Sequence, residues 1–135
     1  MKDFNTLKVL IAEDSAEIAI FMVRYLGQLG CLGENIEVIG DGVLAYARLK
    51  NGELPDLVIT GMQMGGIDQD GDALIKKMRS DPHLCNLPIG MYSSRAKEDD
   101  PLLHQFLKKH QVPFLDKMRL GKEEVKRFLL QILGE

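Results

Sequence analysis

The residues with the clearest chemical use are an adjacent acidic pair, a hydroxyl and a lysine, and each follows a short apolar run. They are Glu13 with Asp14, Ser93 and Lys117. Adjacent carboxylates directly after a strand suit a hard cation such as Mg²⁺. A lysine with a serine hydroxyl suits a phosphoryl or carboxylate oxygen. Because ligands of open parallel sheets bind outside the carboxyl ends of the strands, we expect these four side chains to share one crevice.

The elements that must position this crevice alternate along the chain. Short aliphatic runs predict strands, and apolar residues spaced by three and four positions predict helices. Strict alternation of the two indicates a parallel sheet with helices on both faces. The expected fold class is therefore α/β, a flavodoxin-like five-stranded parallel sheet in the order 2-1-3-4-5. The expected strands are residues 7–12, 36–39, 57–60, 87–92 and 112–117, and the expected helices are residues 18–29, 43–49, 73–80, 102–110 and 122–133.

Composition indicates one ordinary globular domain, residues 1–135, with no output domain attached. The net charge of −3 is a mild acidic excess, which argues against a nucleic-acid surface. Two cysteines, Cys31 and Cys85, are too few and too far apart for a disulfide framework or a zinc site. Since no apolar run approaches the roughly 18 residues of a membrane span, we expect a cytoplasmic protein that binds neither membrane nor nucleic acid.

With Glu13, Asp14, Ser93 and Lys117 at the ends of its expected strands, the chain resembles a response regulator receiver domain of two-component signalling, over essentially its whole length. The resemblance implies a domain that takes a phosphoryl group from a histidine kinase onto an aspartate, with Mg²⁺, and signals through the surface around its last two helices. The matching segments are residues 9–15 with the acidic pair, 41–42, 55–59 with 64 and 66–68 in the phosphoacceptor segment, 88–94 with the switch hydroxyl Ser93, and 114–117 with the lysine.

The same resemblance reveals a departure at the phosphoacceptor position. That position lies six residues after Pro55 and three before Met64, and it is occupied by Gly61. A glycine has no side chain to phosphorylate, so the acceptor site is predicted to be degenerate. The usual proline of the loop is Gly65, and the aromatic switch position is Phe114, which lacks the tyrosine hydroxyl. Two extra residues follow in the loop, at positions 69 and 70.

Neither neighbouring candidate is expected to replace the missing acceptor. Thr60 adjoins the site, but successive strand residues point to opposite faces, so its side chain should point away if Gly61 faces the crevice. Threonine is also a weak nucleophile without an adjacent base, and the motif places no histidine nearby. Asp68 lies in the loop, some way from the strand end. We therefore assign no catalytic residue.

With one carboxylate missing, the cation site is expected to be weak. Glu13 and Asp14 remain as metal ligands, but Lys117 competes for them. An unpaired charge in a partly closed crevice is costly, and so we expect Lys117 to form a salt bridge with Glu13 or Asp14. No cofactor is required, and any Mg²⁺ would bind only weakly.

Three hypotheses follow from these residues. The leading one is a stand-alone receiver-like domain that acts by phosphorylation-independent binding to a signalling protein, such as a histidine kinase or a downstream effector. A homodimer is compatible with it. The alternative is an ordinary Mg²⁺-dependent, phospho-accepting response regulator in which Gly61 is a variant or an engineered change. A small flavodoxin-like enzyme is disfavoured, because the chain has no glycine-rich phosphate loop, nucleophile elbow or Cys/His pair.

Overall fold

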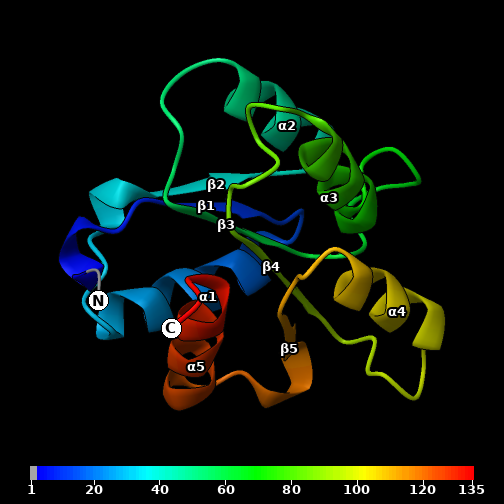
Figure 1. Ribbon diagram of the computed structural model, residues 1–135. Helices are drawn as coiled ribbons and strands as arrows, with labels where there is room; N and C mark the ends of the chain where they lie inside the picture. Colours follow the sequence, from blue (N-terminus) through cyan, green and yellow to red (C-terminus); the bar gives the residue numbers. More distant parts are fainter. Residues whose placement is uncertain (1–2) are drawn as a thin grey trace.

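The computed structural model describes residues 3–135, which form a five-stranded parallel sheet in the order β2-β1-β3-β4-β5 (Figure 1). This is the predicted fold class and strand order, so the prediction is confirmed. The strands are β1 (Val9–Ala12), β2 (Ile36–Ile39), β3 (Leu57–Thr60), β4 (Ile89–Ser93) and β5 (Phe114–Asp116), and the α-helices are α1 (Ala16–Gln28), α2 (Gly42–Lys50), α3 (Gly71–Ser80), α4 (Pro101–Lys109) and α5 (Lys122–Ile132).

Three strands begin later than the sequence predicts, because the first residues of each run bond elsewhere. Pro88 and Pro113 have no N–H to donate, so β4 and β5 start only after them. Their carbonyls still accept hydrogen bonds, from Val58 N–H at 2.9 Å and Met91 N–H at 2.9 Å. In the first run the backbone N–H of Lys8 donates to an Asp56 carboxylate oxygen at 2.8 Å instead of to a neighbouring strand.

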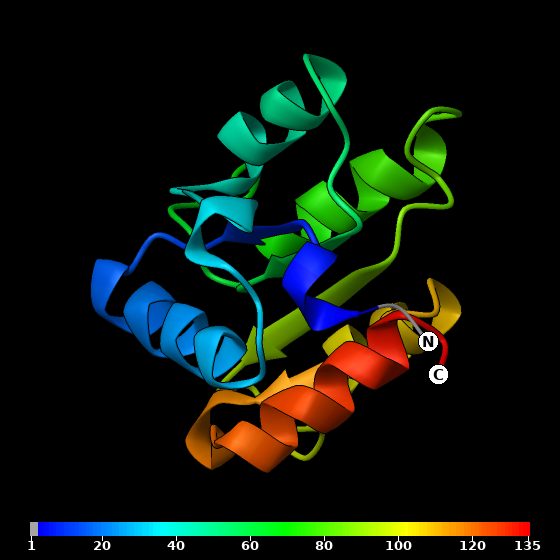
Figure 2. The same ribbon diagram turned by 90° about the vertical axis from the view of Figure 1, so that its left-hand side faces the viewer.

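The helices cover the sheet in two layers, with α1 and α5 on one face and α2, α3 and α4 on the other (Figures 1 and 2). Alternate residues of each strand supply the two cores, because successive side chains of a strand point to opposite faces. Leu10 and Val58 pack toward α2 to α4, whereas Ile11 and Ile59 pack toward α1 and α5. Both faces of the central strands are thus buried, as expected for a parallel sheet.

Four of the five helices begin one or two residues before the predicted starts, and short polar side chains cap some of them. Ser15 Oγ accepts a hydrogen bond from Ile18 N–H at 3.4 Å and so caps the start of α1. The Asp100 carboxylate caps α4 through Leu103 N–H at 3.1 Å. Among residues 3–135 the longest helix, α1, has 13 residues, and none could cross a bilayer.

A polar cluster joins α2 to the end of α3. The Asp81 carboxylate accepts hydrogen bonds from Tyr46 Oη at 2.8 Å, Lys50 Nζ at 2.7 Å and His83 N–H at 2.9 Å. These donors, with Lys50 first, lower the pKa of Asp81 to about 2. The cluster therefore holds one ionised carboxylate with a complete set of donors between two helices.

A single arginine connects three backbone segments on the same side of the sheet. Arg79, in the last turn of α3, donates from Nε to the carbonyl of His110 at 3.1 Å. Its Nη1 donates to the carbonyls of Cys85 at 3.1 Å and Leu87 at 2.9 Å. Burial lowers the pKa of this guanidinium. The side chain thus links α3 to the approach to β4 and to the end of α4.

Candidate functional site

The carboxyl ends of β1, β3, β4 and β5 meet along one edge of the sheet. The parallel register pairs Ala12 with Thr60, and Ser93 with Asp116. The residues that follow these pairs therefore come together at this edge. The predicted residues Glu13, Asp14, Ser93 and Lys117 all line one open cleft of about 580 Å³.

An ion pair occupies the centre of this cleft. Lys117 Nζ donates to Glu13 Oε1 at 3.0 Å, and Ser15 N–H donates to Glu13 Oε2 at 3.1 Å. The Glu13 side chain is 1% exposed and the Lys117 side chain 19%. The predicted salt bridge is thus confirmed, with Glu13 as the partner.

The pKa of Glu13 reflects this enclosure. Burial acts to raise the pKa, but the hydrogen bonds from Ser15 N–H and Lys117 outweigh burial and hold the pKa below its usual value. Asp14 is exposed as a residue, but partial desolvation of its carboxyl, a hydrogen bond with Glu13 and the charge of Glu13 raise its pKa. The two neighbouring carboxylates are therefore unequal: one is fixed in an ion pair and the other faces solvent.

Gly61 lies directly against the Glu13 carboxylate. Its N–H donates to the carbonyl of Ala12 at 2.9 Å, which continues the pairing of β3 with β1. A Cβ built at Gly61 would lie 3.1 Å from Glu13 Oε1, closer than such atoms normally approach. On its other side, Gly71 at the start of α3 packs so closely that a Cβ there would overlap the Gly61 carbonyl oxygen. The backbone of Gly61 is thus enclosed between a carboxylate and a helix.

The loop after Gly61 is organised by Asp70. Asp70 Oδ1 accepts hydrogen bonds from the backbone N–H groups of Met64 at 2.7 Å and Gly66 at 3.3 Å. One of the two extra residues also ties the loop to α2, because the carbonyl of Gln69 accepts from Gly42 N–H at 2.8 Å. Asp68 is exposed in this loop.

Thr60 and the two methionines beside the site are buried. Thr60 is 0% exposed, and its hydroxyl donates to the carbonyl of Gly61 at 2.8 Å. Met62 and Met64 belong to the core between the sheet and α2 to α4. The Thr60 hydroxyl is therefore inaccessible to a phosphodonor in the cleft.

The remaining predicted positions, Ser93 and Phe114, make contacts of their own. Ser93 is buried, and its Oγ accepts a hydrogen bond from Arg95 N–H at 3.1 Å. The Phe114 ring meets the ring of His104 edge-on, with centroids 4.4 Å apart. His104 Nε2 lies 2.8 Å from the carbonyl of Arg95. The end of β4 and the side of α4 are thus connected to Phe114 through one histidine.

The sequence analysis missed Tyr92. This residue is fully buried, and among residues 3–135 its hydroxyl is the only buried side-chain polar atom without a hydrogen-bond partner. Lys117 Nζ lies 4.8 Å from the centre of its ring. Burial and the nearby negative charge of Glu13 raise the pKa of the hydroxyl. A tyrosine in an otherwise apolar strand run is the signal that could have drawn attention to it.

Comparisons with known proteins agree with this fold. Chemotaxis protein CheY-3 of Vibrio cholerae is 32% identical over 95 residues, which cover 70% of this chain and 69% of that protein. The gliding motility regulatory protein of Myxococcus xanthus is 31% identical over 94 residues, 70% of this chain but 11% of that protein. A solved putative response regulator from Chloroflexus aurantiacus superposes with a TM-score of 0.79 at 24% identity, covering 96% and 98% of the two chains.

A comparison with family models also finds a response regulator, and the match covers most of the chain. The model of the response regulator receiver domain matches residues 9–127, from the first residue of β1 into α5. That range contains every residue of the cleft described above. The chain therefore belongs to the response regulator receiver domain family.

Proposed function

We propose that this chain is a receiver module that signals by binding another protein without aspartyl phosphorylation. Its partner is a signalling protein of a two-component pathway, such as a histidine kinase or a downstream effector, and it works in the cytoplasm without enzymatic activity. The observation that carries the proposal is Gly61, which the family resemblance puts at the acceptor position and which has no carboxylate to phosphorylate.

The arrangement around Gly61 supports this proposal. Glu13 lies against the glycine backbone and holds Lys117, the residue that the family resemblance assigns to the phosphoryl group. The neighbouring hydroxyls are poor substitutes, because both Thr60 and Ser93 are buried and neither has a general base described beside it. Lys117 and Ser93 are already engaged by groups of the chain itself.

The residues do not fit a tightly bound Mg²⁺. Within residues 3–135 no three His, Cys, Asp or Glu side chains gather as a metal site. Of the two carboxylates in the cleft, Glu13 is neutralised by Lys117, and only Asp14 faces solvent. Since Mg²⁺ gives up its waters reluctantly and needs favourable charge, we propose that Glu13 and Asp14 bind it weakly at most.

Labelling with a small phosphodonor tests the central step. The chain is incubated with acetyl phosphate and Mg²⁺, and its intact mass is measured. We expect no mass gain for the wild type. Gly61→Asp is the positive control, because only a shift of a few tenths of an ångström by Glu13 is needed to admit its Cβ, and Gly61→Asn is the matched control that cannot be phosphorylated. Phosphoryl gain by the wild type would refute the proposal.

Binding to the partner tests the second step. The affinity of a captured kinase or effector is compared between the wild type and Gly61→Asp, each with and without phosphodonor. We expect wild-type binding that the phosphodonor does not change. Binding that appears only with phosphorylated Gly61→Asp would instead favour an ordinary phospho-accepting regulator in which Gly61 is a variant.

A further inference from the structure

The outer face of α1 exposes two large apolar side chains. Ile20 is 54% exposed and Phe21 50% exposed, in the middle of the helix. The opposite face, through Ala19, Met22 and Leu26, is buried against the sheet and its core. Figure 2 shows α1 at the outer edge of its layer, with α5 beside it on one side only. A helix with apolar residues on both faces has one face left for a partner.

The apolar face continues beyond the helix onto the edge of the sheet. Ile20 and Val23 line a shallow, almost entirely apolar groove together with Val38 of β2. Val38 is 45% exposed, and β2 is an edge strand that pairs only with β1. Ile20, Val23 and Val38 therefore form one contiguous apolar surface across α1 and β2.

Charges flank this surface in a self-complementary order. Glu17 lies three residues before Ile20, and Arg24 lies three residues after Phe21. Residues seven apart lie two helical turns apart on nearly the same line, and both charged side chains are exposed. Arg24 is also held over the Phe21 ring, 5.8 Å from its centre. One helix face thus carries a negative end, an apolar centre and a positive end.

We propose that two copies of this chain pair through antiparallel α1 helices, about a two-fold axis between Ile20 and Phe21. In this register Glu17 of each copy lies opposite Arg24 of the other, and the Ile20 and Phe21 side chains meet their counterparts. A two-fold interface needs such a self-complementary patch. The inference does not rest on the proposed function, because none of Glu13, Asp14, Ser93 and Lys117 takes part in the pairing, although Phe21 also lines their cleft.

The size of the surface sets the expected strength. Stable interfaces bury about 800 Å² on each partner, and one 13-residue helix with the neighbouring edge strand provides less. We therefore expect a weak dimer, with a dissociation constant in the micromolar range. The two flanking charge pairs fix the register and the antiparallel orientation more than they raise the affinity.

Charge reversal with sedimentation equilibrium tests the pairing. Glu17→Arg and Arg24→Glu each place like charges opposite one another, so each variant alone should dimerise at least about tenfold more weakly. A mixture of the two should form a heterodimer, and the double variant E17R/R24E should regain the homodimer. Residues 17 and 24 are too far apart to pair within one helix, where partners lie three or four residues apart. Recovery therefore reports contact between copies.

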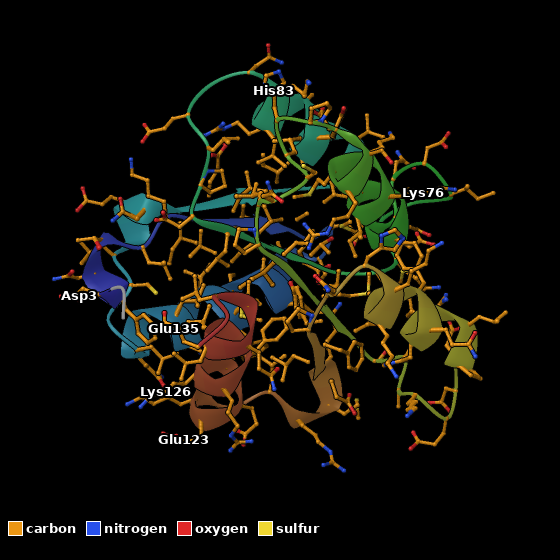
Figure 3. All side chains as sticks on the ribbon, viewed as in Figure 1. Asp3, Lys76, His83, Glu123, Lys126 and Glu135 are labelled. Atoms are coloured by element: carbon orange, nitrogen blue, oxygen red, sulfur yellow. The ribbon has the colours of Figure 1, made fainter. Side chains whose placement is uncertain are left out.

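A matched control separates this effect from the loss of a helix-terminal charge. Glu123 is exposed at the second position of α5, as Glu17 is at the second position of α1, and Figure 3 shows it at the outer end of its helix. Glu123→Arg should leave dimerisation unchanged. A wild type that stays monomeric up to millimolar concentration, or two reversed variants that fail to pair when mixed, would overturn the proposal and leave the α1 face to a different protein.

Discussion

Two carboxylates of this molecule, Glu13 and Asp81, have the same kinds of neighbours but different surroundings. Each is buried, each binds a lysine and each lies near a tyrosine. Asp81 receives hydrogen bonds from Lys50, Tyr46 and a backbone N–H. Glu13 receives bonds from Lys117 and a backbone N–H, while the nearby Tyr92 hydroxyl stays unpaired.

The difference separates a cluster whose polar groups all pair with one another from a cleft whose polar groups do not. In the Asp81 cluster every donor points at the carboxylate, as expected when a polar group serves only to hold helices together. In the cleft the lysine and the carboxylate satisfy each other, but a buried hydroxyl remains without a partner and Asp14 faces solvent. An unsatisfied buried group is costly, so the cleft is less well adapted to stability than the Asp81 cluster.

The largest expected effect comes from removing the lysine of the cleft. Lys117→Met leaves the Glu13 carboxylate, with its 1% exposed side chain, without a counter-charge. We expect a loss of about 3 kcal/mol in the free energy of unfolding, measured by urea denaturation. The double variant K117M/E13Q should recover most of this loss, because it removes both charges. If the double variant is as unstable as the single one, the ion pair is not the cause.

A smaller effect is expected from the structural cluster. Asp81→Asn weakens the bonds from Lys50 and Tyr46, but the Lys50 side chain is 38% exposed and can be hydrated instead. The melting temperature in calorimetry should fall by less than for Lys117→Met. Glu53→Gln, which breaks the more exposed ion pair of Lys8, is the control and should change little. A larger fall for Asp81→Asn than for Lys117→Met would reverse the comparison.

Replacing tyrosine with phenylalanine should have opposite effects on stability at Tyr92 and at Tyr46. Tyr92→Phe removes a buried hydroxyl that has no partner, and so it should be neutral or stabilise the fold by up to about 1 kcal/mol. Tyr46→Phe removes a hydrogen bond to Asp81 and should destabilise the fold. Both are measured by urea denaturation side by side. A clear loss for Tyr92→Phe would mean that its hydroxyl bonds to Glu13 in solution.

The last effect concerns pH. Lys50, Tyr46 and His83 N–H lower the pKa of Asp81 from 3.8 to about 2. A lowered pKa in the folded state stabilises the fold above pH 3.8, and this contribution is lost as the pH falls toward 2. In this window the wild type should lose stability more steeply than Asp81→Asn. Parallel curves for the two proteins would show that Asp81 does not titrate as inferred.

The sequence predicted the sheet and the position of the cleft, because both follow from local patterns. Alternating apolar runs imply a parallel sheet, and parallel strands bring the residues after them to one edge. This is why the pairing of Lys117 with an acidic residue could be expected before the structure. The strand starts were less well predicted, since they depend on which N–H groups find a neighbouring strand.

The sequence could not predict the unpaired hydroxyl of Tyr92 or the cluster around Asp81. All five residues of β4 are buried, so no alternation in the sequence indicates to which face Tyr92 points. Asp81 lies 35 residues from Tyr46 and 31 from Lys50, and their meeting depends on how α2 packs against α3. Both features arise from tertiary distances, which residue spacing alone does not fix.

The Arg79 side chain has a mechanical consequence. Because one guanidinium donates to carbonyls of His110, Cys85 and Leu87, we expect a displacement of the end of α4 to be coupled to α3 and to the segment before β4. The end of α4, the last turn of α3 and the residues before β4 should therefore move together. A partner that pulls on the end of α4 would therefore displace the base of β4, the strand whose opposite end carries Ser93 into the cleft.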